Sequence, residues 1–272
     1  MVAKRLKITL TGLLVAAACS TTPTEPGFDN PIIPDDPNYV PPLTTIVSGP
    51  AEGDVVDAHT VTFVWSGNQS GMSFQYRLAG GAWPDWAGDT TATFALLDEG
   101  AYTFEVIGRY ASGIEEESAH SRSYTIDDIQ GPALWLTPRF QSVTQGGSVT
   151  VELMLEDVSN VLAVKAALTF NPAQLQVTAL EIYEDSRSLL KSTGGTVIPF
   201  SAYDNSAGTI TIEVATATGS PAGVSGTGAI AAITLTVSQA GEITWSDASE
   251  LRDASNAAIT ILETAAAVVG VQ

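Results

Sequence analysis

The 272-residue chain has 30 acidic and 11 basic residues, which give it a formal net charge of −19. Such a surface repels nucleic acids and anionic lipid surfaces, so the charge excludes both as partners. Hydrophobic residues make up 44% of the chain, a share that is normal for a folded protein and too high for a disordered one. The length is sufficient for about two domains.

The chain begins with a short basic segment that is followed by an apolar one. Lys4, Arg5 and Lys7 precede the apolar run 8–18, which is too short to span a bilayer and is typical of the core of a signal peptide. Small residues close the run directly before Cys19, the only cysteine of the chain. This end resembles a lipobox, the signal at which a cysteine is acylated and the chain is cut before it. An ordinary secretory signal with a chance cysteine is the alternative.

The lipobox resemblance predicts a lipoprotein signal peptide at residues 1–18 and lipidation at Cys19. No later apolar stretch approaches the length of a membrane span, so the lipid is the only membrane anchor that we expect. Ser20 follows the cysteine where a retention signal would have an aspartate. We therefore expect an extracytoplasmic protein of the cell envelope, held at the outer membrane or cell surface.

A proline-rich linker is predicted from Cys19 to Thr44. Prolines favour an extended backbone, and their irregular spacing here is typical of a spacer rather than of a binding motif. The seven prolines are Pro23, Pro26, Pro31, Pro34, Pro37, Pro41 and Pro42.

Residues 45–128 are predicted to form a small all-β domain. Polar and apolar residues alternate in three runs, 61–65, 74–78 and 102–106, and glycine-containing turn signals separate them. This spacing without a helical pattern predicts a β-sandwich with Trp65 in its core. The segment ending at Tyr102 resembles a tyrosine corner, and the whole domain resembles the immunoglobulin-like or fibronectin-like spacer domains of bacterial surface proteins.

Trp83 and Trp86 are the conspicuous surface candidates of this domain. Two tryptophans three residues apart on a loop can stack on the apolar faces of sugar rings. The alternative, which we favour, is that both rings fold onto the edge of the sandwich.

Residues 131–272 are predicted to form a longer all-β domain. The alternating runs are 149–153, 164–170, 209–214, 233–237 and 268–271, and a turn is expected at 157–161. About eight to ten strands are sufficient for a sandwich of the jelly-roll type.

Two motifs in this domain indicate a family. Phe170-Asn171-Pro172 leads to Leu175, and Gly226-Thr227-Gly228 leads into an apolar strand. In this order they resemble a cohesin domain, the receptor module that captures dockerin domains in cellulosomes and cell-surface assemblies. The resemblance covers residues 131–272, although cohesins more often have Tyr-Asp-Pro at the first motif.

The resemblance implies binding through one flat face of the sandwich, but the sequence does not say which. If Val164 and Ile212 point inward, the alternation of a strand directs their neighbours outward. The outward residues that we take as candidates for partner binding are Lys165, Ala167, Thr169, Thr211 and Glu213. An ordinary solvated sheet surface is the alternative.

Catalysis has little support in the sequence. His59 and His120 are the only histidines, and the chain has no Gly-x-Ser-x-Gly motif, no zinc-type cluster and no complete dinucleotide fingerprint. Acidic pairs are too numerous to mark a glycosidase site. Neither an EF-hand loop nor the calcium-binding repeats of a dockerin occur. We expect no enzyme, metal or cofactor, and a receptor rather than the docked partner.

The sequence thus predicts two β-sandwich domains behind a signal peptide and a proline-rich linker. The predicted function is a non-catalytic, surface-anchored, monomeric binding protein. It captures a dockerin-bearing extracellular protein. The association with such a partner implies a role in polysaccharide binding or catabolism. Direct carbohydrate binding or adhesion is the alternative, and a purely structural envelope protein is the third possibility.

Overall fold

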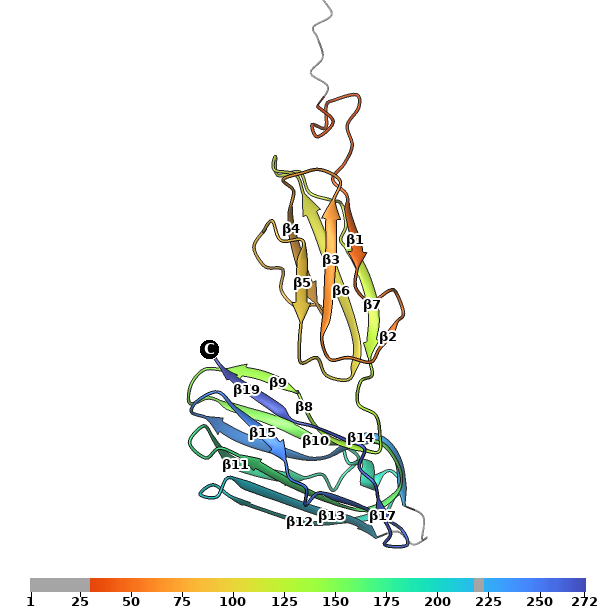
Figure 1. Ribbon diagram of the computed structural model, residues 1–272, viewed down its shortest axis with the longest axis vertical. Helices are drawn as coiled ribbons and strands as arrows, with labels where there is room; N and C mark the ends of the chain where they lie inside the picture. Colours follow the sequence, from red (N-terminus) through yellow and green to blue (C-terminus); the bar gives the residue numbers. More distant parts are fainter. Residues whose placement is uncertain (1–29, 218–222) are drawn as a thin grey trace, which may run out of the picture. The chain divides into compact units, whose positions relative to one another are not determined.

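The computed structural model describes residues 30–217 and 223–272 (Figure 1). The predicted signal peptide and Cys19 lie outside the described residues. Within these ranges no helix is both long and apolar enough to cross a membrane. The chain divides into two compact units, residues 1–41 and 42–272. In the described part of the first unit, residues 31–38 form turns instead of the extended backbone that the prolines predict, because Asp36 accepts hydrogen bonds from the N–H groups of Asn30 and Asn38.

Residues 44–126 form two sheets in which most strand pairs are antiparallel, in agreement with the predicted all-β domain. One sheet has the order β1-β3-β5 and the other the order β2-β7-β6-β4. The strands are β1 (Thr44–Ser48), β2 (Val55–Val56), β3 (Val61–Gly67), β4 (Ser73–Leu78), β5 (Thr91–Phe94), β6 (Gly100–Arg109) and β7 (His120–Ile126).

Aromatic side chains from both sheets fill the core of this domain. Phe63 and Phe104 are fully buried and stacked, with ring centroids 4.0 Å apart, and Trp65 is buried beside them as the sequence predicts. The Tyr102 hydroxyl donates a 3.1 Å hydrogen bond to the carbonyl of Asp98, four residues earlier. The predicted tyrosine-corner bond is therefore present.

A buried carboxylate holds the first strand of this domain. Glu116 accepts hydrogen bonds from the backbone N–H and the hydroxyl of Thr44, and from the N–H of Gly108. His120 Nε2 lies 3.1 Å from the same carboxylate. Because β1 begins at Thr44, this carboxylate fixes the point at which the chain enters the domain.

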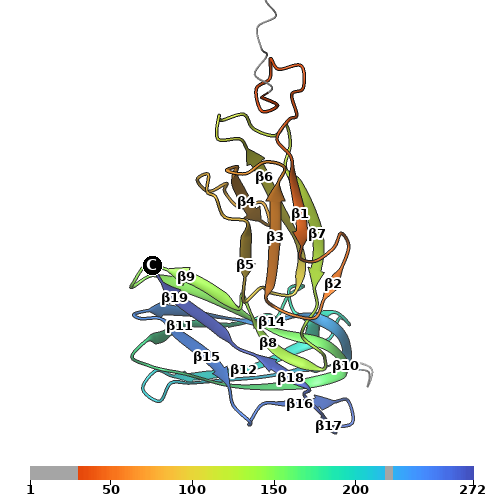
Figure 2. The same ribbon diagram turned by 45° about the horizontal axis from the view of Figure 1, so that its top comes forward.

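The second β domain contains the remaining strands. They are β8 (Ala133–Thr137), β9 (Phe140–Val143), β10 (Ser148–Phe170), β11 (Leu175–Ile182), β12 (Thr196–Asp204), β13 (Thr209–Ala217), β14 (Val224–Val237), β15 (Gly241–Trp245), β16 (Glu250–Asp253), β17 (Ala258–Ile259), β18 (Glu263–Ala265) and β19 (Ala267–Val271). A short 3₁₀ helix, η1 (Leu189–Lys191), precedes β12. The strands lie in two layers, which Figures 1 and 2 show from two directions.

The long strand β10 belongs to both layers. Its first part pairs with β8 and β14, and its second part pairs with β13, β15 and β16. The segment 157–161, predicted as a turn, lies within this strand instead. Asp157 and Asn160 adopt positive φ values of 47° and 58° there, and the register with β14 shifts on either side of Val158. These bulges redirect the strand without ending it.

Alternating side chains of β10 supply the core between the layers. Val151, Leu153 and Leu155 are buried in its first part, and Val164 and Leu168 in its second part. They pack against buried aliphatic side chains of β8, β13 and β14, so the two layers share one apolar core.

An ion-pair cluster surrounds the segment that joins β7 to β8. The buried Arg139 guanidinium donates to both carboxylate oxygens of Asp128, at 3.0 and 2.9 Å. Burial opposes ionisation of Asp128, but the hydrogen bonds from Arg139 lower its pKa. Glu99 accepts hydrogen bonds from the N–H groups of Asp128 and Ile129. The pKa of Glu99 is raised to about 7, mainly by burial and secondly by a side-chain hydrogen bond with Asp128.

Candidate functional site

The outer surface formed by β12, β13, the second part of β10, and β16 is the candidate site, and we call it the four-strand face. The strand register arranges its outward side chains in rows. The first row contains Ile198, Ala215, Ala163 and Arg252, and the second contains Phe200, Glu213, Lys165 and Glu250. The third contains Ala202, Thr211 and Ala167, and the fourth contains Asp204, Thr209 and Thr169, beside which Thr244 of β15 follows.

All five candidates from the sequence lie on this face. Their inward neighbours Val164, Ala166, Leu168, Ile212 and Val214 are buried, so the side-chain directions that the alternation predicts agree with the structure. The register places Lys165 opposite Glu213 and Ala167 opposite Thr211. A role in binding stays a prediction for each of them.

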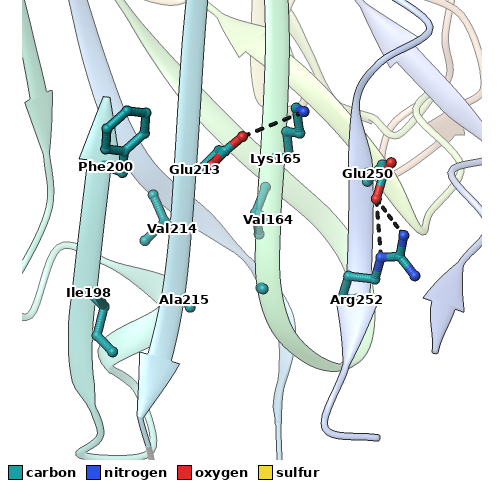
Figure 3. A pocket seen from close by; sticks show the side chains of 10 residues that line it. Val164, Lys165, Ile198, Phe200, Glu213, Val214, Ala215, Glu250 and Arg252 are labelled. Atoms are coloured by element: carbon teal, nitrogen blue, oxygen red, sulfur yellow. Dashed lines mark hydrogen bonds and ion pairs between the residues drawn. The ribbon is translucent and has the colours of Figure 1, made fainter. Parts of the chain in front are cut away.

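A hollow of about 340 Å³ lies in the first two rows of the four-strand face. Ala163 and Ala215, which are opposite each other in the register of β10 and β13, line it with small side chains. Ile198 and Phe200 of β12 border one side, as Figure 3 shows. Ile198 is 56% exposed and Phe200 is 60% exposed. Water-exposed apolar side chains beside a concave surface are typical of a protein contact site.

Ile198 and Phe200 are not among the residues that the sequence predicts, because no strand is expected where β12 lies. The segment 196–204 contains β-favouring residues, but Pro199 interrupts the alternation. Proline is tolerated in edge strands, and among the described strands β12 pairs with β13 alone. The run Val197-Ile198-Pro199-Phe200 was the available signal.

Two ion pairs also border the hollow. Lys165 Nζ lies 3.5 Å from Glu213 Oε1, across β10 and β13. Arg252 Nη2 lies 2.7 Å from Glu250 Oε2 on β16, and its hydrogen bond lowers the pKa of that carboxylate. Both pairs are drawn in Figure 3. The hollow therefore has equal numbers of positive and negative groups, in a chain with a large excess of acid.

The outer surface of β10's first part and β14 is different in character. The hydroxyls of Thr150 and Thr234 form a 3.0 Å hydrogen bond, and the Tyr183 hydroxyl donates a hydrogen bond to Glu152. Burial and this carboxylate raise the pKa of Tyr183 to about 12. The four-strand face is the better candidate for a protein contact, because it has the exposed apolar side chains of Ile198 and Phe200 beside a hollow.

Trp83 and Trp86 lie on a loop beside β4 and are each partly buried. The guanidinium of Arg77 lies 4.3 Å from the ring centroid of Trp83, and that of Arg109 lies 4.4 Å from Trp86. Gln75 donates a hydrogen bond to the carbonyl of Pro84, which holds the loop to the strand. One face of each indole is thus occupied by a cation, which leaves less ring surface for a sugar.

The two histidines each lie beside a carboxylate. His59 Nδ1 lies 3.0 Å from Asp128, and His120 pairs with Glu116. In residues 30–217 and 223–272, no group of three or more His, Cys, Asp and Glu side chains is placed to hold a metal ion.

Comparison with known proteins finds a family match in the second β domain. The cohesin domain matches residues 138–268. Similar solved structures include a non-cellulosomal cohesin from the archaeon Archaeoglobus fulgidus, with 15% identity, TM-score 0.41, and coverage of 52% of this chain and 90% of that one. A type II cohesin domain from the cellulosome of Acetivibrio cellulolyticus has 16% identity and TM-score 0.43, and the match covers 50% of this chain and 94% of that one.

A third similar structure is the third cohesin of ScaC from Acetivibrio cellulolyticus, solved in complex with the ScaB dockerin. It has 15% identity and TM-score 0.42, and the match covers 51% of this chain and 97% of that one. Among curated proteins, the comparison finds no match. The family match assigns residues 138–268 to the cohesin domain.

Proposed function

We propose that this chain is a non-catalytic receptor whose cohesin domain captures a dockerin-bearing extracellular protein. The family match at residues 138–268 supports the receptor role, because cohesin domains are binding modules. The similar cohesin of ScaC is itself solved with a dockerin. The single structural observation that carries the proposal is the four-strand face, where exposed Ile198 and Phe200 border a hollow.

The rest of the chain fits a role in presenting this domain. We propose that Cys19 is lipidated, that residues 19–44 are a linker, and that residues 45–128 are an immunoglobulin-like spacer. The protein is then a monomeric lipoprotein of the cell envelope, exposed at the outer membrane or cell surface. A context of polysaccharide binding or catabolism follows from association with dockerin-bearing proteins.

Direct carbohydrate binding is the competing function, and the structure gives it less support. Its candidates, Trp83 and Trp86, each have a guanidinium stacked on one ring face. Arg77, which stacks on Trp83, also donates hydrogen bonds of 2.6 and 3.0 Å to Glu105. A sugar that displaced this guanidinium from the indole would disturb that second contact.

The test is a capture experiment with the full chain in detergent, against the secreted proteins of its host and a panel of insoluble polysaccharides. The expected result is capture of a dockerin-bearing protein by the native chain and its loss in a Phe200→Asp variant. A Phe140→Asp variant is the matched control, because Phe140 is an exposed phenylalanine on β9, away from the four-strand face. Retention on polysaccharide with no dockerin-bearing protein captured would overturn the proposal.

A further inference from the structure

The segment that connects β7 to β8 is held by side chains from both β domains. Glu99, which directly precedes β6, accepts hydrogen bonds of 2.9 Å from the N–H groups of Asp128 and Ile129. From the second β domain, the guanidinium of Arg139, between β8 and β9, donates to both carboxylate oxygens of Asp128. The N–H of Arg139 also donates a 2.6 Å hydrogen bond to Asp98. We call Asp98, Glu99, Asp128 and Arg139 the joint.

The joint has more negative than positive charge. Three carboxylates share one guanidinium, and the Arg139 side chain that carries it is only 5% exposed. Glu99 Oε1 lies 3.8 Å from Arg139 Nη2, so the guanidinium that binds Asp128 is also beside a second acid. His59 Nδ1 lies 3.0 Å from Asp128 and adds a positive charge when it is protonated. The Tyr102 hydroxyl, bonded to a main-chain carbonyl, also faces this group of acids.

One proton reduces this excess of negative charge. When Glu99 is protonated, its side chain forms a hydrogen bond with the carboxylate of Asp128, in addition to the bonds that it accepts from two N–H groups. Two ionised carboxylates at the same place would instead repel each other, and a partly buried site screens that repulsion poorly. Burial and the shared hydrogen bond together raise the pKa of Glu99 to about 7. Asp128 stays the ionised partner, because hydrogen bonds from Arg139 outweigh its burial and lower its pKa.

The other contacts of the connecting segment do not depend on this proton. Ile129 is buried in a small apolar cluster with side chains of β8, so this end of the segment is fixed to the second β domain. The N–H of Asp127 donates to a carbonyl of β2 and fixes the other end to the first β domain. Titration of Glu99 therefore acts between two fixed points, at Asp128.

We propose that the joint is a proton-controlled clamp between the two β domains. With the Glu99 carboxyl protonated, the domains move as one body. With it ionised, they reorient more freely about the main chain between Asp127 and Ile129. The second β domain is thus held in a fixed direction relative to the first in acidic surroundings, and it samples more directions in neutral and alkaline ones. The clamp does not depend on which partner that domain binds.

The direction of the pH effect follows from where the proton binds more tightly. The pKa of Glu99 is about 7 in the clamped joint, against an ordinary value of 4.5, toward which it returns when the joint loosens and water reaches the carboxyl. An acid with a raised pKa stabilises the clamped state at low pH, and this contribution is lost as the pH rises to about 7. Between pH 5 and pH 8, the ratio of clamped to loosened chains should therefore fall by up to about 100-fold.

The test measures the distance between two spin labels, one on each β domain, by pulsed electron paramagnetic resonance on the full chain in detergent. Ser70→Cys carries the first label and Ala240→Cys the second, because both residues are exposed and lie between strands, outside the joint. Cys19→Ser in every variant leaves the introduced thiols as the only ones. A narrow distribution of distances indicates a clamped joint, and a broad one indicates a loosened joint.

With the native joint, the distance distribution should broaden about twofold or more from pH 5 to pH 8. Glu99→Gln keeps a neutral side chain that can donate to Asp128, so its distribution should stay narrow at both pH values. Glu117→Gln is the matched control, the same change at an exposed glutamate, and should broaden like the native joint. His59→Gln should also broaden, because the proton that controls the clamp is on Glu99.

Several outcomes would overturn the clamp. A native distribution of equal width at both pH values would do so, as would a Glu99→Gln distribution that broadens as much as the native one. Loss of the pH response in His59→Gln would assign the controlling proton to that histidine instead. Thermal unfolding at pH 5 and pH 8 shows whether both β domains stay folded, and broadening that coincides with unfolding of either domain would also contradict the clamp.

Discussion

Lys165 and Glu213 face each other across β10 and β13, with Nζ and Oε1 3.5 Å apart at the edge of an apolar hollow. Both side chains are more than one-third exposed, so water screens their attraction. Such surface pairs contribute about 0 to 1 kcal/mol to stability. The pair is thus more important for the shape and charge of the four-strand face than for the fold.

The first prediction concerns this pair. Lys165→Gln and Glu213→Gln, alone or together, should change the free energy of unfolding by less than about 1 kcal/mol. Urea denaturation of the three variants forms a double-mutant cycle with the native chain. A coupling energy well above that value would mean that the pair supports the fold.

The second prediction compares two phenylalanines of the same domain. Phe200→Ser should leave stability nearly unchanged, because the side chain is 60% exposed, whereas Phe170→Ser should cost about 3 kcal/mol or more. Phe170 is buried at the end of β10, so its removal leaves a cavity. Thermal unfolding of both variants measures the difference. Equal destabilisation would show that Phe200 packs against the core.

The third prediction concerns the carboxylate that holds β1. Glu116→Ala leaves the N–H groups of Thr44 and Gly108 without their acceptor, and this should cost about 2 to 4 kcal/mol. Glu117→Ala is the matched control, since that neighbouring glutamate is exposed. Hydrogen exchange of the β1 amides should rise in Glu116→Ala alone. Unchanged protection of β1 would argue against the role of this carboxylate.

The fourth prediction is a pH dependence from Glu99, whose pKa is raised to about 7, mainly by burial. An acid with a raised pKa in the folded state holds its proton there after the unfolded chain has released it. Its contribution to stability therefore falls as pH rises from about 4.5 to above 7, by a loss on the order of 2 kcal/mol. Glu99→Gln keeps the side chain neutral and should remove this loss.

The measurement is urea denaturation of the full chain at several pH values between 5 and 8, with Glu117→Gln as the control for loss of one acid. The native chain and the control should lose stability in parallel over this range, and Glu99→Gln should lose less. The same slope in Glu99→Gln would assign the pH dependence to other groups, such as Asp98, whose pKa burial also raises.

The parts of the fold that the sequence predicts are those with uninterrupted alternation. The run 164–170 in β10 and the run 209–214 in β13 have the predicted inward and outward residues, because burial between two layers enforces a period of two. The sequence could not place these two strands beside β12 and β16, since pairing depends on contacts between residues far apart in the chain.

The features that the sequence missed have local physical causes. Pro199 concealed β12, and with it Ile198 and Phe200. Asp157 and Asn160 are typical turn residues, but here their positive φ values accommodate bulges inside β10. The Asp36 carboxylate accepts hydrogen bonds from backbone N–H groups of the linker and so favours turns there. Proline content alone does not reveal this preference.

The continuity of β10 has a consequence for how this domain opens. One covalent strand of 23 residues supplies the centre of both layers, so neither layer can detach while the other stays intact. The domain should therefore behave as a single cooperative unit, with the slowest-exchanging amides distributed over both halves of β10 rather than confined to one sheet. A load applied to the four-strand face is accordingly shared by the whole core.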